Sequence, residues 1–121
     1  VISANDDRLG AEMCFRLGLA RAMTIQKPIV VIEEPTSNGD AQIEQVTREA
    51  IENIASMNMI TIVLPARART LWSAHQVIFL QGGRLVAVGK HAALLEQNDA
   101  YRHWNYMRFS PHLAVARATT S

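Results

Sequence analysis

The chain reads Pro28-Ile29-Val30-Val31-Ile32-Glu33-Glu34-Pro35 at the point that decides its fold. Four consecutive β-branched residues are typical of a short strand that is covered on both faces of a sheet. The strand ends in two carboxylates, Glu33 and Glu34, and ligands of open α/β sheets bind at the carboxyl ends of strands. A first acid there can hold Mg²⁺ through water, and a second can orient an attacking water. The alternative is that the pair is only a solvated strand end.

The residues after this strand predict a β-α-β unit. Residues 35–40 are dense in turn formers, and Asp40 can cap the next helix. Apolar residues then recur at helical spacing over residues 41–57, with charged residues between them. A second β-branched run, residues 59–64, predicts another strand. A helix between two strands predicts parallel pairing and an α/β fold.

The residues before the strand predict a long helix over residues 9–26, because their apolar positions form two stripes at helical spacing. Such a helix is buried on much of its circumference. Asp6 and Asp7 can cap its first amides. Cys14 lies within this helix, so it is interpreted as packing rather than as a reactive thiol.

The rest of the chain predicts a hairpin and two closing helices. A short helix over residues 67–73 is followed by strands over residues 76–80 and 84–88, with Gly82-Gly83 as the turn of a hairpin at the sheet edge. Closing helices follow, and Pro111 ends the second. Residues 110–121 are expected to form a disordered tail. The aromatic residues expected to close the core are Trp72, Tyr101, Trp104, Tyr106 and Phe109.

Composition excludes several classes of protein. The 121 residues are 49% hydrophobic and 19% charged, which indicates one folded domain. A net charge of +1 without a basic patch argues against nucleic acid as a partner. One cysteine and no zinc-ligand spacing exclude stapled and zinc folds. No apolar run approaches the length of a membrane span, and a start at Val1 suggests part of a longer protein.

Four motifs in this order resemble the C-terminal half of an ABC-type ATP-binding domain, of the exporter-like branch. Residues 28–37 look like the Walker B strand with its catalytic glutamate, and residues 37–40 look like the D-loop. Residues 16–22 are similar to the helix after the family's signature, and residues 83–91 with Leu94-Leu95 resemble the stretch after the switch histidine. Residues 1–109 are therefore expected to be half of such a domain.

The resemblance implies a fold, cofactors and partners. The fold would be a P-loop NTPase-like parallel sheet with flanking helices and an antiparallel edge hairpin. The cofactors would be ATP and Mg²⁺, with Glu34 as the catalytic residue, Glu33 at the metal, and Asp40 at the nucleotide. The partners would be the transporter's transmembrane domain and a second nucleotide-binding domain, at the cytoplasmic face of the membrane. The family's phosphate-binding loop lies upstream of this stretch.

The chain also departs from the family pattern. At the signature it reads Leu9-Gly10-Ala11-Glu12-Met13, which lacks the serine and both glycines. Glu12 would repel a polyanion there by roughly 4 kcal/mol at 4 Å and an effective dielectric of 20. Glu33 stands where the family has an aspartate, and Ala66 stands where it has the switch histidine. The residues expected to face nucleotide are Gly10, Ala11, Glu12, Asp40 and Ala66.

These departures predict a degenerate nucleotide-binding domain that binds ATP weakly, with weak or no hydrolysis by this chain. One alternative is a dimerisation or regulatory scaffold derived from an ABC ATPase. An active ATPase with unusual motifs is a third possibility, because Glu34 is present. His91 resembles a histidine that the family also has, and a structural capping role is preferred for it over catalysis. His75, His103 and His112 are expected at the surface.

Overall fold

The computed structural model describes residues 10–36, 41–57 and 60–110. The chain divides into two compact units, Val1–Ala66 and Arg67–Ser121. Each unit combines helices with one two-stranded sheet, parallel in the first unit and antiparallel in the second. The α/β class predicted from the sequence is therefore confirmed. Asp6, Asp7, Asp40, His112 and the expected tail from residue 111 lie outside the described residues.

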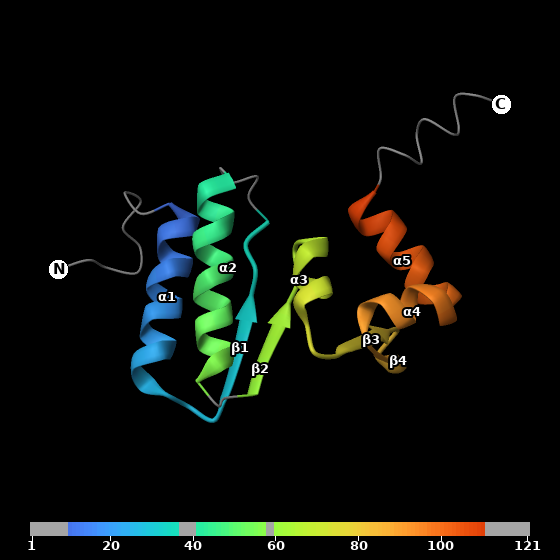
Figure 1. The fold of residues 1–121 in the computed structure, drawn as a ribbon, viewed down its shortest axis with the longest axis horizontal. Helices are drawn as coiled ribbons and strands as arrows, with labels where there is room; N and C mark the ends of the chain where they lie inside the picture. The colour runs from blue at the N-terminus through green and yellow to red at the C-terminus, as the bar shows by residue number, and fades with distance from the viewer. Residues whose placement is uncertain (1–9, 37–40, 58–59, 111–121) are drawn as a thin grey trace. The chain divides into compact units, whose positions relative to one another are not determined.

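The first unit contains the predicted β-α-β arrangement. Its elements are α1 (Ala11–Ile25), β1 (Ile29–Glu33), α2 (Ala41–Ser56) and β2 (Ile60–Leu64). The strands β1 and β2 pair in parallel, in a register that runs from Ile29 opposite Ile60 to Glu33 opposite Leu64. The amino ends of α1 and α2 and the carboxyl ends of β1 and β2 lie at the same end of this unit (Figure 1). Parallel pairing is thus confirmed.

The core of the first unit lies between the helices and one face of the sheet. Its buried residues are Leu19 of α1, Ile32 of β1 and Ile54 of α2. Successive strand residues alternate between the two faces of a sheet, so Val30 and Val63 pack on the same core as Ile32. One layer of two helices therefore covers one face of this sheet.

The opposite face of the same sheet is exposed in this chain. Its apolar side chains are Ile29, Val31, Ile60, Ile62 and Leu64, each between 46% and 63% exposed. The expectation that the strand is covered on both faces is wrong for these residues, as is the expectation that the helix over residues 9–26 is buried on much of its circumference. Met13 and Leu17 are about half exposed, and Cys14 is exposed rather than packed. An apolar run indicates a preference for burial but not the presence of a covering layer.

The second unit contains the hairpin and the closing helices. Its elements are α3 (Ala68–Ser73), β3 (Val77–Gln81), β4 (Arg84–Gly89), α4 (His91–Gln97) and α5 (Asp99–Phe109). The φ angles of Gly82 and Gly83 are 56° and 73°, which is the left-handed region that a tight two-residue hairpin turn requires. The predicted hairpin is therefore confirmed.

The hairpin was also expected to lie at the edge of the parallel sheet. Strands β3 and β4 form a two-stranded sheet of their own, and no pairing joins them to β1 or β2 in the described part of the chain. The expected place of the hairpin at the edge of the parallel sheet therefore stays a prediction, because the two sheets belong to different units. Turn chemistry specifies the pairing of two neighbouring strands, whereas the order of strands in a sheet depends on contacts between distant segments.

Aromatic side chains form the core of the second unit. Phe79 of β3, Tyr101 of α5 and Leu94 of α4 are buried, and Trp104 and Phe109 pack against them. Tyr101 is fully buried, with its ring edge-on to Phe79 at 5.3 Å. The prediction that these aromatics close the core is confirmed for Tyr101, Trp104 and Phe109, but Trp72 is 61% exposed.

Candidate functional site

Glu34 and Ala66 meet at the carboxyl ends of the two parallel strands. The Glu34 side chain is buried, with the residue 6% exposed. Its Oε2 accepts a hydrogen bond of 2.9 Å from the backbone amide of Ala66, which is 32 positions further along the chain. The sequence placed both residues at the candidate site for separate reasons. The structure brings them into direct contact.

The register of β1 and β2 explains this contact. Glu33 is the last residue of β1 and lies opposite Leu64, the last residue of β2. The Glu34 amide then donates a hydrogen bond of 3.1 Å to the Leu64 carbonyl. Pro65 follows and has no N–H, so the next amide of this segment belongs to Ala66. Glu34 is therefore bound to the last residue of β2 through its main chain and to the segment after β2 through its side chain.

Glu33 has a different environment from its neighbour. It is exposed, and alternation along β1 places it on the open face of the sheet with Ile29 and Val31. The described residues contain no group of three or more histidine, cysteine, aspartate or glutamate side chains able to hold a metal ion. Magnesium usually keeps several waters and binds one or two carboxylates together with substrate phosphates. Glu33 therefore fits a magnesium site only as one ligand among phosphate and water oxygens.

The residues at the expected signature begin helix α1. Gly10 is its N-cap, and its carbonyl accepts hydrogen bonds from the amides of Met13 and Cys14 at 3.0 and 3.2 Å. Gly10 itself has no side chain that could cap the helix. A side chain added at Gly10 would meet no atom within 4 Å. Ala11 and Glu12 follow in the first turn, where helix amides lack intrahelical partners and favour anions.

The structure thus brings some of the predicted residues to one end of the first unit, and one lies outside the described residues. Gly10, Ala11 and Glu12 lie at the amino end of α1, the same end of the unit as Glu33, Glu34 and Ala66 (Figure 1). Asp40, the expected D-loop residue, lies outside the described residues. A helix amino end beside two strand carboxyl ends is an arrangement that suits an anionic ligand.

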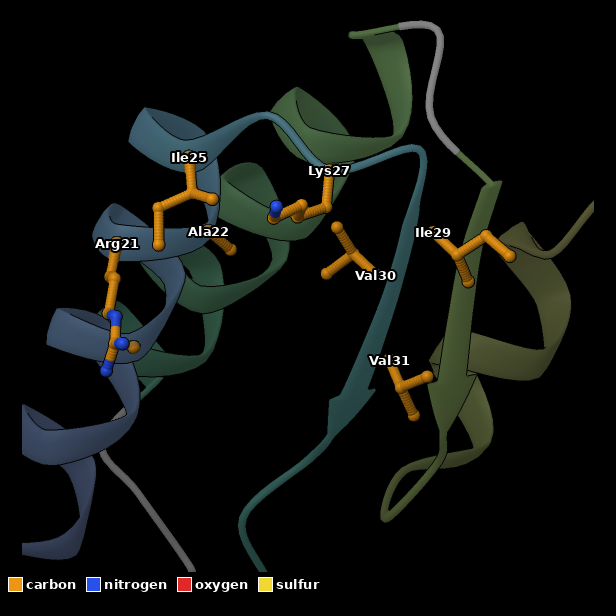
Figure 2. A pocket seen from close by; sticks show the side chains of 8 residues that line it. Arg21, Ala22, Ile25, Lys27, Ile29, Val30 and Val31 are labelled. Atoms are coloured by element: carbon orange, nitrogen blue, oxygen red, sulfur yellow. The ribbon is translucent and has the colours of Figure 1, made fainter.

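A pocket in the first unit involves none of these residues. It has a volume of about 280 Å³ and is lined by Gly18, Arg21, Ala22, Ile25, Lys27, Ile29, Val30 and Val31. Figure 2 shows these side chains coming from α1 and from β1 with the residues just before it. The sequence carries no signal for this pocket, because its lining combines a helix face with the start of a strand and contains no motif.

His91 belongs to the core of the second unit rather than to this site. Its ring is buried at the start of α4, with Nδ1 2.6 Å from the Tyr101 hydroxyl oxygen and with the Trp72 ring edge-on at 4.4 Å. Burial lowers the pKa of His91 from 6.5, because it disfavours the charged ring. The preference for a structural role agrees with this packing, although the side chain contacts Tyr101 rather than capping the helix. His75 and His103 are exposed, as expected.

No helix in the described segments combines the length and the apolar character that a membrane span needs. Among the ranges described, the longest helix is α2, with 16 residues, and it carries charged side chains.

Comparison with known proteins identifies relatives of this chain. An ATP-dependent lipid A-core flippase of Chromobacterium violaceum is 36% identical over 110 residues, which is 91% of this chain and 19% of the flippase. Proteins of the same name from Francisella tularensis and Burkholderia thailandensis are 34% identical over 100 residues and 32% identical over 109 residues. These matches cover 83% and 90% of this chain, and 16% and 18% of the two relatives. No family model matches the chain.

Proposed function

Because this chain is homologous to part of the ABC exporters named ATP-dependent lipid A-core flippases, we propose that it is part of a degenerate nucleotide-binding domain. In this proposal, ATP binding is coupled to transmembrane transport, with weak or no hydrolysis by this chain. The chain spans less than a fifth of the length of these relatives. In this proposal, ATP binding and transport are activities of the whole transporter and not of this chain alone.

The observation that carries the proposal is the hydrogen bond between the Glu34 carboxylate and the Ala66 amide. The resemblance assigns Glu34 to the catalytic glutamate and Ala66 to the switch position, two parts of one nucleotide site. The two residues meet at the carboxyl ends of parallel strands, which is where α/β folds bind ligands. A glutamate buried to this extent at a strand end is also unlike a solvated end, where it would face water.

The degenerate character rests on the side chains present at the candidate site. The side chain of Ala66 has no polar group that can contact a phosphate oxygen or hold a water molecule. Glu12 belongs to the first turn of α1, and a negative charge at this position of the sequence opposes the binding of an anionic ligand at the helix amino end. Glu33 is longer by one methylene than the aspartate of the family pattern. Together these residues favour weak binding of ATP and weak or no hydrolysis.

The cofactors of the proposal fit this site in part. Bound Mg²⁺ and ATP would supply a polarised γ-phosphate for attack by water. Glu33 would contribute one magnesium ligand, and the first-turn amides of α1 would face phosphate oxygens. An ionised carboxylate accepts hydrogen bonds and donates none. Glu34 would therefore accept a hydrogen bond from the attacking water molecule and then its proton. The phosphate-binding loop of the family would have to come from outside residues 1–121.

The partners follow from the same resemblance. We propose that the domain works with a transmembrane domain of its transporter and with a second nucleotide-binding domain, at the cytoplasmic face of the membrane. The second domain would share the nucleotide, because the family binds ATP between two copies of this fold. A homodimer would carry the Glu12 and Ala66 changes at both of its sites.

The second candidate function is a dimerisation or regulatory scaffold without catalysis. The exposed sheet face of the first unit favours it, because five apolar side chains there are each about half exposed or more among the described residues. A scaffold would use this face for association and would have no need of nucleotide. Nucleotide binding therefore discriminates between the two candidates.

A titration of the 121-residue chain with Mg-ATP, followed by amide chemical shifts, tests the proposal. We expect saturable shifts at Gly10, Glu34 and Ala66 with a dissociation constant in the millimolar range, since few phosphate ligands are present. Hydrolysis should not exceed the rate in buffer. The matched control is Arg102→Gln, in α5 of the second unit, which should leave the titration unchanged.

Two outcomes would contradict the proposal in different ways. Sub-micromolar affinity would show that the phosphate site is misplaced and that the site is not degenerate. Absence of any shift at these three residues up to 20-fold the expected constant, about 20 mM ATP, would favour the scaffold.

A further inference from the structure

The contact between Glu34 and Ala66 occupies a particular place in the hydrogen-bond pattern of the sheet. In a parallel ladder, a residue on one strand donates to and accepts from residues two apart on its partner. Glu34 donates to the Leu64 carbonyl at 3.1 Å, so the next hydrogen bond of the ladder would run from the Ala66 amide to the Glu34 main-chain oxygen. The hydrogen bond observed at 2.9 Å ends on the Glu34 side chain instead.

We propose that the backbone amide of Ala66 is the positioning group for the Glu34 carboxylate, so that the sheet register, and no side chain at position 66, sets its direction. This inference rests on the proposed function only for the catalytic role of Glu34, and the hydrogen bond itself does not depend on that role. Pro65 supports the arrangement, because it has no N–H and restricts Leu64 to extended backbone. The amide of Ala66 is therefore the first donor after β2.

Because Glu34 is buried, its carboxylate depends on this hydrogen bond in place of water. Glu34 is 6% exposed, so its carboxylate has little access to water, and a buried carboxylate needs donors to replace it. Hydrogen bonds to charged groups contribute more than those between neutral groups. One oxygen of the carboxylate is thereby turned toward the segment after β2. The glutamate keeps this direction even though alanine stands where the family has a side chain that can form hydrogen bonds.

The inference makes a distinction between amide and side chain at position 66. Ala66→Gly and Ala66→His both keep the amide, so both should keep the Glu34 direction. Ala66→Pro removes the donor and should release the carboxylate. Because two consecutive prolines can disturb the fold, Glu34→Ala and Glu34→Gln provide a second route. Glutamine keeps an oxygen that accepts from the amide, whereas alanine has none.

The experiment uses the isotope-labelled 121-residue chain without nucleotide. We expect a coupling across the hydrogen bond between the Ala66 amide nitrogen and the Glu34 carboxylate carbon, and a single side-chain rotamer for Glu34 from its three-bond couplings. Glu34→Ala should speed exchange of the Ala66 amide with solvent by about 10- to 100-fold, as expected for loss of a hydrogen bond to a charged group. Glu34→Gln should keep most of this protection.

The results separate the inference from the proposed function. Absence of the coupling in the wild-type chain, or averaged Glu34 rotamers in Ala66→Gly, would overturn the inference. Averaged rotamers in a folded Ala66→Pro chain with a single rotamer in Ala66→His would support it. None of these readouts requires nucleotide, so a failed Mg-ATP titration would refute the proposed function while leaving the positioning role in place.

Discussion

The Nδ1 atom of His91 lies 2.6 Å from the hydroxyl oxygen of Tyr101, and both side chains are buried in the second unit. His91 begins α4 and Tyr101 lies in α5, so this hydrogen bond joins two helices. The two rings are edge-on at 5.7 Å, and the Trp72 ring of α3 lies edge-on to His91. Three helices therefore meet at one imidazole.

The first prediction concerns the energy of this hydrogen bond. Tyr101→Phe keeps the ring and removes the hydroxyl, which leaves the buried Nδ1 of His91 without this partner. We expect a loss of about 1–3 kcal/mol in the free energy of unfolding of the second unit. Both tryptophans of the sequence, Trp72 and Trp104, lie in this unit, so urea unfolding followed by tryptophan fluorescence measures it.

A double-mutant cycle with His91→Phe provides the control for this prediction. Residues in direct contact show coupling energies of about 0.5–3 kcal/mol. Tyr106→Phe is the matched hydroxyl deletion, because Tyr106 is only half-buried in the same helix. If the coupling is near zero, or if Tyr106→Phe costs as much as Tyr101→Phe, the hydrogen bond does not stabilise the unit.

The second prediction is a pH dependence of stability. Burial lowers the pKa of His91 in the folded unit below its unfolded value of 6.5. Below pH 6.5 the unfolded chain therefore binds a proton that the folded chain does not. The contribution of His91 to the free energy of unfolding has its full value above pH 6.5 and decreases as the pH falls below it. The slope for one proton is at most about 1.4 kcal/mol per pH unit. Urea midpoints between pH 7.5 and pH 4.5 measure it.

Histidine variants attribute this pH dependence to one residue. The groups packed on the imidazole from α3 and α5 are Trp72 and Tyr101, and neither carries a charge in this pH range, since burial raises the pKa of Tyr101 above 10.0. His91→Phe should remove the slope near pH 6, and His103→Gln, at an exposed position, should keep it. An unchanged slope in His91→Phe would contradict the assignment.

The hairpin of the second unit shows what local sequence predicts well. Gly82-Gly83 between two β-branched segments specified the turn, the pairing and the strand bounds within one residue. The irregularity of register between Phe79 and Leu80 had no sequence signal. The place of the hairpin relative to the parallel sheet stays a prediction, because strand order depends on contacts between segments that the local pattern does not contain.

The third prediction concerns the turn residue Gly82. Its φ of 56° is left-handed, and a Cβ there would meet no atom within 4 Å, so only backbone strain opposes substitution. Gly82→Val should cost about 1–3 kcal/mol, whereas Gly82→Asn should cost less, because asparagine enters this region more readily. Thermal unfolding by tryptophan fluorescence ranks the two variants. Equal losses for Val and Asn would show that the turn angle does not limit stability.

The candidate site was predictable only in its residue types. A buried strand followed by carboxylates indicated Glu33 and Glu34, and chain order indicated Ala66. The hydrogen bond between Glu34 and the Ala66 amide could not be predicted, because it depends on a ladder register that links positions 32 residues apart. Coverage of the sheet was also overestimated, since β-branched residues favour burial whether or not a second layer is present.

The fourth prediction concerns the exposed sheet face of the first unit. Val31 and Ile62 lie opposite each other in the register and are 63% and 46% exposed. Contiguous exposed apolar side chains promote association, so we expect the chain to self-associate at micromolar concentrations. The double variant Val31→Lys, Ile62→Lys should raise the concentration of half-association at least about tenfold, the effect of 1.4 kcal/mol. Sedimentation velocity measures this concentration.

Leu17 provides the matched control for the sheet face. It is about half exposed on α1, the helix that packs on the opposite face of the sheet, so Leu17→Lys removes a comparable apolar side chain from another surface. This control should associate like the wild-type chain. A monomeric wild-type chain, or equal dissociation by Leu17→Lys, would show that the sheet face does not drive association.

The last prediction uses two opposite effects of one charge. Glu12 is the second residue of α1 after its N-cap Gly10, where a negative charge stabilises the helix dipole by about 0.3–1 kcal/mol and repels an anionic ligand. Glu12→Gln should therefore lower the stability of the first unit slightly while raising affinity for Mg-ATP. Repulsion of about 1 kcal/mol, the value for two unit charges at 4 Å in water, corresponds to roughly fivefold in affinity. Calorimetric titration of Mg-ATP beside far-ultraviolet circular dichroism melts measures both effects. Glu44→Gln, in the first turn of α2, is the matched control for helix stability. If Glu12→Gln binds Mg-ATP no more tightly than the wild-type chain, the amino end of α1 is not part of the nucleotide site.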